Sequence, residues 1–282
     1  MGSFGGRAGN RAGRELAAWN VVLLTDGPDA LGVALNGSSS SRMRYVVSLW
    51  FFALFLITAP LLFTLGAVLF VVAYPLDPDR QWLHVLVCRW CYGLWLHASP
   101  GWRVRVEGRE LLPKGPCVYV VNHQSFADIL AVMGLFTPYK FVAKASLFRT
   151  PLVGWMMTLL GYVPIVRGSS TSMEQLLGPC RRWLRKGIPV LIFPEGTYSP
   201  GELLPFKRGA FQLALEEHVP VVPVLVRGTR ELVDGDGPWM SPRATVTVQV
   251  MPALPPETFG PDSAALATRV REQYVEALAR VG

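Results

Sequence analysis

The dominant hydrophobic pattern in this sequence is a long uncharged segment near the amino end. From Tyr45 to Leu76 there are 32 consecutive residues without Asp, Glu, Lys or Arg. As a helix, this segment would measure about 48 Å at ~1.5 Å per residue, longer than the ~30 Å hydrocarbon core of a bilayer. Because Pro60 lies near its middle, it is interpreted as one tilted, kinked spanning helix or as two short helices that enter one leaflet and return.

Tryptophan is concentrated in and just after this segment, where five of the nine tryptophans of the chain fall. Indole prefers the headgroup boundary of a membrane, because its ring is apolar and its N–H stays hydrated. Arg89 interrupts the apolar pattern between residues 81 and 102, so that stretch is expected to lie in the interface rather than to cross. The five tryptophans are Trp50, Trp82, Trp90, Trp95 and Trp102.

After Pro100 the pattern changes to short apolar runs that end in turns and alternate with helical periodicity. The alternation predicts an α/β domain with a mixed or parallel central sheet flanked by helices, preceded by the membrane-embedded helical motif. We therefore divide the chain into a flexible extension (1–44), a membrane-associated motif (45–102) and an α/β domain (103–282). The expected strands are Cys117–Val121, Pro189–Phe193, Val219–Val226 and Thr245–Val250, and the expected helices are Phe126–Leu135, Ser172–Lys186, Phe211–Glu217 and Ser263–Val281.

Composition narrows the class of protein. The 282 residues are 51% hydrophobic and only 17% charged, which excludes a disordered chain and disfavours an ordinary soluble globule. The net charge of +7 indicates an anionic partner: nucleic acid, a phospholipid surface or a phosphate-bearing substrate. Nucleic acid is the weakest of these, because the basic residues are not gathered with aromatic residues on one face.

The cysteines do not suggest a metal site. Cys88 and Cys91 form a C-x-x-C pair inside an aromatic, helix-like stretch, and no second pair or suitably spaced histidines would complete four zinc ligands. We expect a structural role for this pair and no metal.

The first candidate for chemistry follows the first expected strand, in the run Asn122-His123-Gln124-Ser125-Phe126-Ala127-Asp128. A histidine at the end of a strand, with a carboxylate at the start of the next helix, suits a general base and the group that orients it. Ser125 and Asp128 also have the spacing of a helix capping box, so a purely structural role is the alternative.

A second candidate, Phe193-Pro194-Glu195-Gly196-Thr197, follows another apolar strand. Glu195 could accept a hydrogen bond from a substrate hydroxyl, Gly196 allows close approach of the backbone, and Thr197 offers a hydroxyl. A plain polar turn is the alternative. The cations near these loops are Lys144, Arg149, Arg167, Lys207 and Arg208.

In order and spacing, these segments resemble the four sequence blocks of the glycerolipid acyltransferases, and most of all the 1-acyl-glycerol-3-phosphate (lysophosphatidate) acyltransferases. The resemblance covers about residues 80–250. It rests on His123-x4-Asp128, on the segment from Lys144 through Pro151, Gly154 and Gly161 to Arg167, on Phe193-Pro194-Glu195-Gly196-Thr197, and on Val219-Pro220-Val221-Val222-Pro223. Family resemblance also favours two helices that dip into the membrane over a spanning helix.

The resemblance implies that His123 is the general base and Asp128 its orienting partner, with direct attack of the acceptor alkoxide on an acyl thioester. No acyl-enzyme is needed, in agreement with the absence of a G-x-S-x-G motif. Glu195, Gly196 and Thr197 would hold the glycerol phosphate, and Arg167 and Lys144 would help to bind the phosphate or the acyl donor. Where the family commonly has Arg after Glu-Gly-Thr, this chain has Tyr198, so either Lys207 or Arg208 supplies the charge or the acceptor is not lysophosphatidate.

The expected activity is therefore O-acyl transfer from acyl-CoA or acyl carrier protein to a lysophospholipid, with no metal or resident cofactor. Membrane lipids would be partners, and the enzyme would lie at the inner membrane with its catalytic domain facing the cytoplasm. The alternatives are another acceptor, such as a lyso-ornithine lipid or glycerol 3-phosphate, and a lipase or thioesterase in which the same pair activates water.

Overall fold

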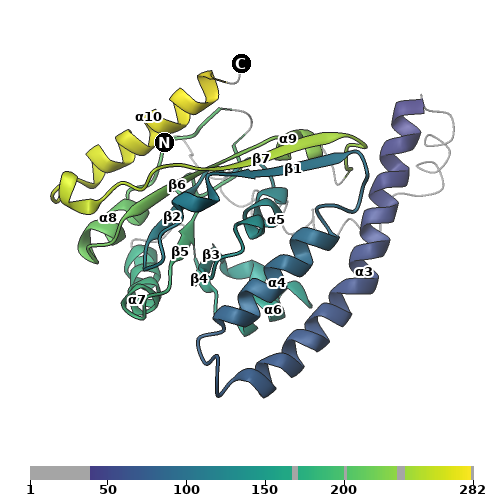
Figure 1. Cartoon of the computed structure of the whole chain (residues 1–282), viewed down its shortest axis with the longest axis horizontal. Coiled ribbons are helices and arrows are strands. Elements are labelled where there is room, and N and C mark those ends of the chain that lie inside the picture. Colours follow the sequence, from purple (N-terminus) through teal and green to yellow (C-terminus); the bar gives the residue numbers. More distant parts are fainter. Residues whose placement is uncertain (1–38, 167–170, 200–201, 234–238, 281–282) are drawn as a thin grey trace, which may run out of the picture.

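The computed structural model describes residues 39–166, 171–199, 202–233 and 239–280. Its centre is a seven-stranded sheet in the order β1-β7-β6-β2-β5-β3-β4 (Figure 1). The sheet is mixed: β6 and β7 pair antiparallel, and the other pairs of neighbours are parallel. The strands are β1 (Trp102–Glu107), β2 (Val118–Val121), β3 (Lys140–Lys144), β4 (Val163–Ile165), β5 (Val190–Ile192), β6 (Val221–Arg227) and β7 (Ala244–Val250).

Helices cover both faces of the sheet, as the sequence predicted (Figure 1). Side chains of β2 alternate between two hydrophobic clusters: Tyr119 and Val121 face one, Val118 and Val120 the other. The first cluster includes residues of α3 (Ser39–Ala73), α4 (Gln81–Leu94), α5 (Ala127–Val132) and α6 (Val153–Leu159). The second includes residues of α7 (Thr171–Arg185), α8 (Gly209–Glu216) and α10 (Ser263–Ala279), and the short α9 (Thr229–Leu232) follows β6.

The four expected strands are present, displaced by at most two residues at either end, but three further strands escaped prediction. In β1 the side chains at alternate positions are charged and exposed, so the apolar run is broken. β3 has a lysine at each end, and β4 has only three residues, one of them proline. These strands are recognisable through pairing with their neighbours rather than through hydrophobicity.

The interpretation of residues 45–76 as two short helices divided at Pro60 is wrong. Helix α3 continues through Pro60 to Ala73, and the chain reverses only afterwards, so that α3 and α4 form a hairpin (Figure 1). A proline inside a helix removes one backbone donor without necessarily ending the helix. The carbonyl of Pro60 itself accepts a hydrogen bond of 2.9 Å from Oγ1 of Thr64. The two-helix motif therefore consists of α3 and α4.

Helix α3 contains the candidate membrane segment. Residues Ser41–Ala73 are long and apolar enough to cross a bilayer, judged by length and composition, and only 17% of the most apolar window is buried inside the protein. Its outward side carries exposed large side chains, among them Leu49, Ile57 and Val71. This helix is therefore a candidate for membrane association.

Three of the tryptophans expected at a headgroup boundary direct their indole N–H to the protein instead. Trp50 donates to the carbonyl of Ala98 at 2.9 Å, Trp95 to Oγ1 of Thr58 at 2.9 Å, and Trp102 to the carbonyl of Ser241 at 2.7 Å. The first two bonds connect α3 to the end of α4 and the residues after it, and the third connects β1 to the segment before β7.

Cys88 and Cys91 are buried in α4 as free thiols. Of the expected flexible extension, residues 1–38 lie outside the described residues and residues 39–44 begin α3. The division of the chain at residues 44 and 102 stays a prediction.

Candidate active site

The candidate site lies where three neighbouring parallel strands end. β2 pairs with β5 on one side and β6 on the other, all parallel, so their carboxyl ends share one edge of the sheet. His123 follows β2, Glu195 follows β5, and Thr229 begins the short helix after β6. In α/β sheets, substrates bind outside this edge. The sheet order therefore brings together two motifs that lie 72 residues apart in the sequence.

His123 and Asp128 form a hydrogen-bonded pair, with 2.8 Å between Nδ1 and Oδ2. As expected, His123 lies in the turn before α5 and Asp128 in the first turn of that helix. The same oxygen accepts the backbone N–H of Gln124 at 2.6 Å and of Ser125 at 2.9 Å, and Oγ of Ser125 accepts the N–H of Ala127 at 3.2 Å. The Asp128 carboxylate therefore caps the start of the helix and orients His123 at the same time, so the two interpretations do not exclude each other.

This geometry determines which nitrogen of His123 can act as a base. Because Nδ1 faces a carboxylate, Nδ1 carries the proton of the neutral imidazole, and the lone pair is on Nε2. No hydrogen bond of Nε2 is found among the described residues. The Asp128 side chain is fully buried, and that of His123 is 9% exposed. The imidazole can therefore accept a proton from a bound hydroxyl, while the carboxylate stabilises the resulting cation.

Thr229 is a site residue that the sequence analysis missed. Its Oγ1 donates a hydrogen bond to Oδ1 of Asp128, the carboxylate oxygen that does not contact His123. Thr229 is fully buried. Nearby, the side-chain amide of Asn122 bonds the backbone N–H of Val226 at 2.7 Å and its carbonyl at 2.8 Å, tying the end of β2 to β6. No sequence motif marks Thr229, which lies 101 residues from Asp128.

Glu195 connects the two motifs. Its Oε1 accepts the backbone N–H of His123 at 2.9 Å, and its Oε2 accepts the N–H of Leu204 at 3.0 Å. The residue is only 3% exposed. Burial raises the pKa of Glu195 above its ordinary value, although the two backbone donors oppose that shift. Glu195 therefore stabilises the position of the His123 loop, whether or not it also contacts a substrate hydroxyl.

Two aromatic rings lie against the imidazole of His123. Phe193 stacks on it, with ring centroids 3.9 Å apart and planes at 14°, and Tyr198 lies 4.4 Å away with its plane tilted by 55°. The backbone N–H of Ser199 donates to the carbonyl of His123 at 2.7 Å. The segment from Glu195 to Ser199 is thus attached to the backbone of His123 at both ends. Hydrophobic patterning alone does not reveal these ring contacts.

The expected cations differ in their positions. Gly196 has φ +70°, and a Cβ built on it would lie 2.5 Å from Nζ of Lys207, so the Lys207 side chain lies directly against this turn. Thr197 is exposed on the same turn, and Arg208 is exposed at the start of α8. Lys144 ends β3, the strand beside β5, and is half-buried. Arg167 lies outside the described residues.

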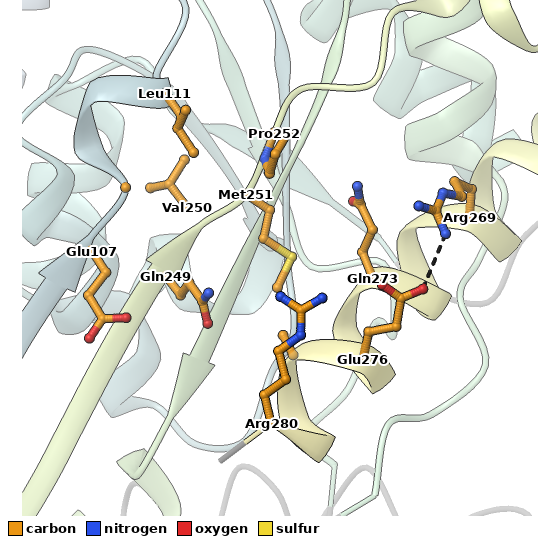
Figure 2. A pocket seen from close by; sticks show the side chains of 12 residues that line it. Glu107, Leu111, Gln249, Val250, Met251, Pro252, Arg269, Gln273, Glu276 and Arg280 are labelled. Carbon is orange, nitrogen blue, oxygen red and sulfur yellow. Dashed lines mark hydrogen bonds and ion pairs between the residues drawn. The ribbon is translucent and has the colours of Figure 1, made fainter.

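A groove of about 400 Å³ lies elsewhere, between the ends of β1 and β7 and helix α10 (Figure 2). Glu107, Val250 and Gln273 are among its lining residues. Val250 pairs with Val224 in the middle of β6, so the groove lies away from the edge that carries His123. Within the described parts of the chain, no group of three or more His, Cys, Asp or Glu side chains is arranged to hold a metal ion.

The chain is similar to known acyltransferases. A sequence profile of the family described as Acyltransferase matches residues 103–227. A 1-acyl-sn-glycerol-3-phosphate acyltransferase of Pseudomonas aeruginosa is 33% identical over 76% of this chain and 83% of its own length. A chloroplast enzyme of the same name from Brassica napus is 39% identical over 59% of this chain, and this chain spans only about half of its length (50%).

The fold is also similar to a solved structure. The crystal structure of the 1-acyl-sn-glycerophosphate (LPA) acyltransferase PlsC from Thermotoga maritima superposes with a TM-score of 0.68 at 26% identity, covering 84% of this chain and 95% of that one. The similarity extends well beyond residues 103–227.

Proposed function

Since the chain belongs to the acyltransferase family that includes the 1-acyl-sn-glycerol-3-phosphate acyltransferases, we propose that it acylates the free hydroxyl of 1-acylglycerol 3-phosphate to give phosphatidic acid. The acyl donor is a fatty acyl thioester of coenzyme A or of acyl carrier protein, used as a co-substrate. No resident cofactor or metal takes part. The observation that carries the proposal is the His123–Asp128 pair at the shared edge of β2, β5 and β6.

The reaction proceeds in a ternary complex. Nε2 of His123 takes the proton of the acceptor hydroxyl as its oxygen attacks the thioester carbonyl, and Asp128 stabilises the imidazolium. When the tetrahedral intermediate collapses, the carbon–sulfur bond breaks and the imidazolium returns its proton to the leaving thiolate. An ester and a free thiol are formed, and His123 is neutral again. The buried carboxylate and its donors keep the imidazole in the correct tautomer throughout.

The acceptor phosphate is bound beside the turn at Gly196. Lys207 supplies the positive charge there, because its ammonium group lies against Gly196. Arg208, which is exposed like Lys207, is the residue before α8. Thr197 and the N–H groups of the turn add hydrogen bonds, and Lys144 approaches from the neighbouring strand. This arrangement supports a phosphate acceptor even though Tyr198 cannot supply a fixed charge.

The protein works at the inner membrane with its catalytic domain on the cytoplasmic side. The exposed apolar side of α3 inserts into the bilayer, and the net charge of +7 suits a surface of anionic lipid. If α3 spanned the membrane, Arg42 and Arg44 would lie opposite the catalytic domain, which the positive-inside tendency disfavours. A cysteine introduced near residue 40 should resist labelling from outside intact cells, and external labelling would refute this orientation.

Purified protein in mixed micelles tests the proposed activity. Two donors, acyl-CoA and acyl carrier protein, are each combined with lysophosphatidate, glycerol 3-phosphate and a lyso-ornithine lipid, and the products are measured by mass spectrometry. We expect phosphatidic acid as the main product. Preference for another acceptor would overturn the assignment of the phosphate pocket. Release of free fatty acid at an equal rate without any acceptor would instead identify a thioesterase.

A further inference from the structure

The segment between Glu195 and Ser199 is held over His123 in an unusual way. Glu195 accepts the backbone N–H of His123, and Ser199 donates to its carbonyl, so both ends of the segment are fixed to the same residue. Tyr198 precedes Ser199, and its position therefore follows from the fixed backbone at that end. With a ring centroid 4.4 Å from that of His123, Tyr198 is in van der Waals contact with the imidazole.

Tyr198 and Phe193 both pack against the imidazole. Phe193 is nearly parallel to the imidazole at 3.9 Å and so occupies one face. Tyr198, with its centroid 4.4 Å away and its plane tilted by 55°, makes a second ring contact. The Nδ1 edge is taken by Asp128. Two rings and a carboxylate therefore surround the imidazole, in line with the low exposure of His123, only 7%.

The two rings differ in how they are supported. Phe193 is half-buried and also packs against Phe141, with ring centroids 5.6 Å apart. Tyr198 is 49% exposed, yet the His123 beneath it is only 7% exposed. A half-exposed ring thus shields a nearly buried base from the solvent side. Water that reached Nε2 would compete with the acceptor hydroxyl for the lone pair.

From this geometry, and resting on the proposed function, we infer that Tyr198 is a positioning residue that covers His123, excludes water from it and holds Nε2 toward the acceptor hydroxyl. The aromatic ring, which makes the observed contact with the imidazole, carries this role. A packing contact of this kind acts on the base rather than on the substrate. Its removal should therefore lower kcat and leave KM for the acceptor unchanged.

Two variants and a matched control test the inference. Tyr198→Ala removes the ring and Tyr198→Phe keeps it. The control is Tyr74→Ala, because Tyr74 is also 49% exposed but lies in the turn after α3 and packs against Phe70. We expect Tyr198→Ala to lower kcat about 5- to 30-fold, which corresponds to a rise of about 1–2 kcal/mol in the activation free energy when the base is misplaced. Tyr198→Phe and Tyr74→Ala should each keep kcat within twofold of the wild type.

A second measurement does not depend on activity. Deuterium exchange at the C2 position of each imidazole, followed by mass spectrometry, reports access of water to each histidine. The chain has internal standards, because His84 is fully buried while His97 and His218 are exposed. We expect His123 to exchange slowly in the wild type and in Tyr198→Phe, and several-fold faster in Tyr198→Ala, with the other three histidines unchanged.

Failure of the proposed function and failure of the inference about Tyr198 give different results. If the wild type transfers no acyl group, the proposed function fails, and the exchange measurement still tests whether Tyr198 covers His123. Unchanged exchange of His123 in Tyr198→Ala would overturn the inference. It would also be overturned if Tyr198→Phe were as impaired as Tyr198→Ala, because the hydroxyl would then be the essential group. A raised KM with unchanged kcat in Tyr198→Ala would place the ring in acceptor binding and overturn it as well.

Discussion

Replacing Asp128 with asparagine isolates the charge of the carboxylate from its hydrogen bonds. In the wild type, Oδ2 accepts from Nδ1 of His123 and from the backbone N–H groups of Gln124 and Ser125, while Oδ1 accepts from Thr229. An asparagine oxygen can occupy the Oδ2 position and keep all three N–H bonds. Its amide nitrogen then faces the Thr229 hydroxyl, which can rotate to accept. Asp128→Asn should therefore fold, with the negative charge as the main loss.

Loss of this charge should destabilise mainly the transition state, because His123 becomes positively charged there. Opposite unit charges about 4 Å apart attract by about 4 kcal/mol at an effective dielectric constant of ~20, and Asp128 is fully buried. We expect most of this, about 3–4 kcal/mol, to be lost, which corresponds to a fall in kcat of about 10²- to 10³-fold. Folding should lose no more than ~1 kcal/mol, the net value of one hydrogen bond.

Initial rates of phosphatidic acid formation, together with thermal unfolding, measure both effects. Asp262→Asn is the matched control, because Asp262 also accepts two backbone N–H groups at the start of a helix but contacts no histidine. It should keep kcat within twofold of the wild type. The reasoning fails if Asp128→Asn retains kcat within threefold, or if its loss of activity only follows a large fall in Tm.

Further variants test the other parts of the site and the sheet that supports it. Thr229→Val should lower kcat about 10- to 150-fold, since a hydrogen bond to a charged group is worth ~1.5–3 kcal/mol. Thr229→Ser should restore most of the activity in the same rate assay. Lys207→Gln should raise KM for lysophosphatidate about tenfold, because a charge-assisted contact with the phosphate is lost. Arg208→Gln should keep KM near the wild-type value, and equal effects of the two substitutions would contradict the phosphate assignment. Burial lowers the pKa of Lys140 to about 8, so between about pH 8 and 10.5 the unfolded chain binds more protons than the folded one and stability should rise with pH. In thermal unfolding at pH 7.5 and 9.5, this rise, up to ~2 kcal/mol, should disappear in Lys140→Met.

Much of the fold follows from local sequence patterns. The apolar runs that became β2, β5, β6 and β7 are bounded by turn residues, and their buried side chains explain why hydrophobicity reveals them. The edge strands β1 and β4, and the short β3 with a lysine at each end, lack a long apolar run and are recognised through pairing with their neighbours. For α3, the presence of Pro60 suggested a break, but a helix can lose one backbone donor and continue.

The candidate site was predictable where its residues are close in sequence and hidden where they are not. His123 and Asp128 share one turn, so their spacing carried the signal. The hydrogen bond from Thr229 and the ring contact of Tyr198 depend on the order of the strands, which no local pattern records. Glu195 was expected near this site and bonds the backbone of His123 and Leu204, a structural role that the sequence did not suggest.

The most direct test of the central claim is single-residue removal of the base. Purified wild type and His123→Ala are compared with saturating acyl-CoA and lysophosphatidate, and the intact mass of each protein is measured after incubation with donor alone. The mechanism predicts a loss in kcat of at least about 10²-fold in His123→Ala, an unfolding temperature within a few degrees of the wild type, and no acylated protein in either case. Turnover of His123→Ala within tenfold of the wild type, or a stable acyl adduct on the protein, would contradict it.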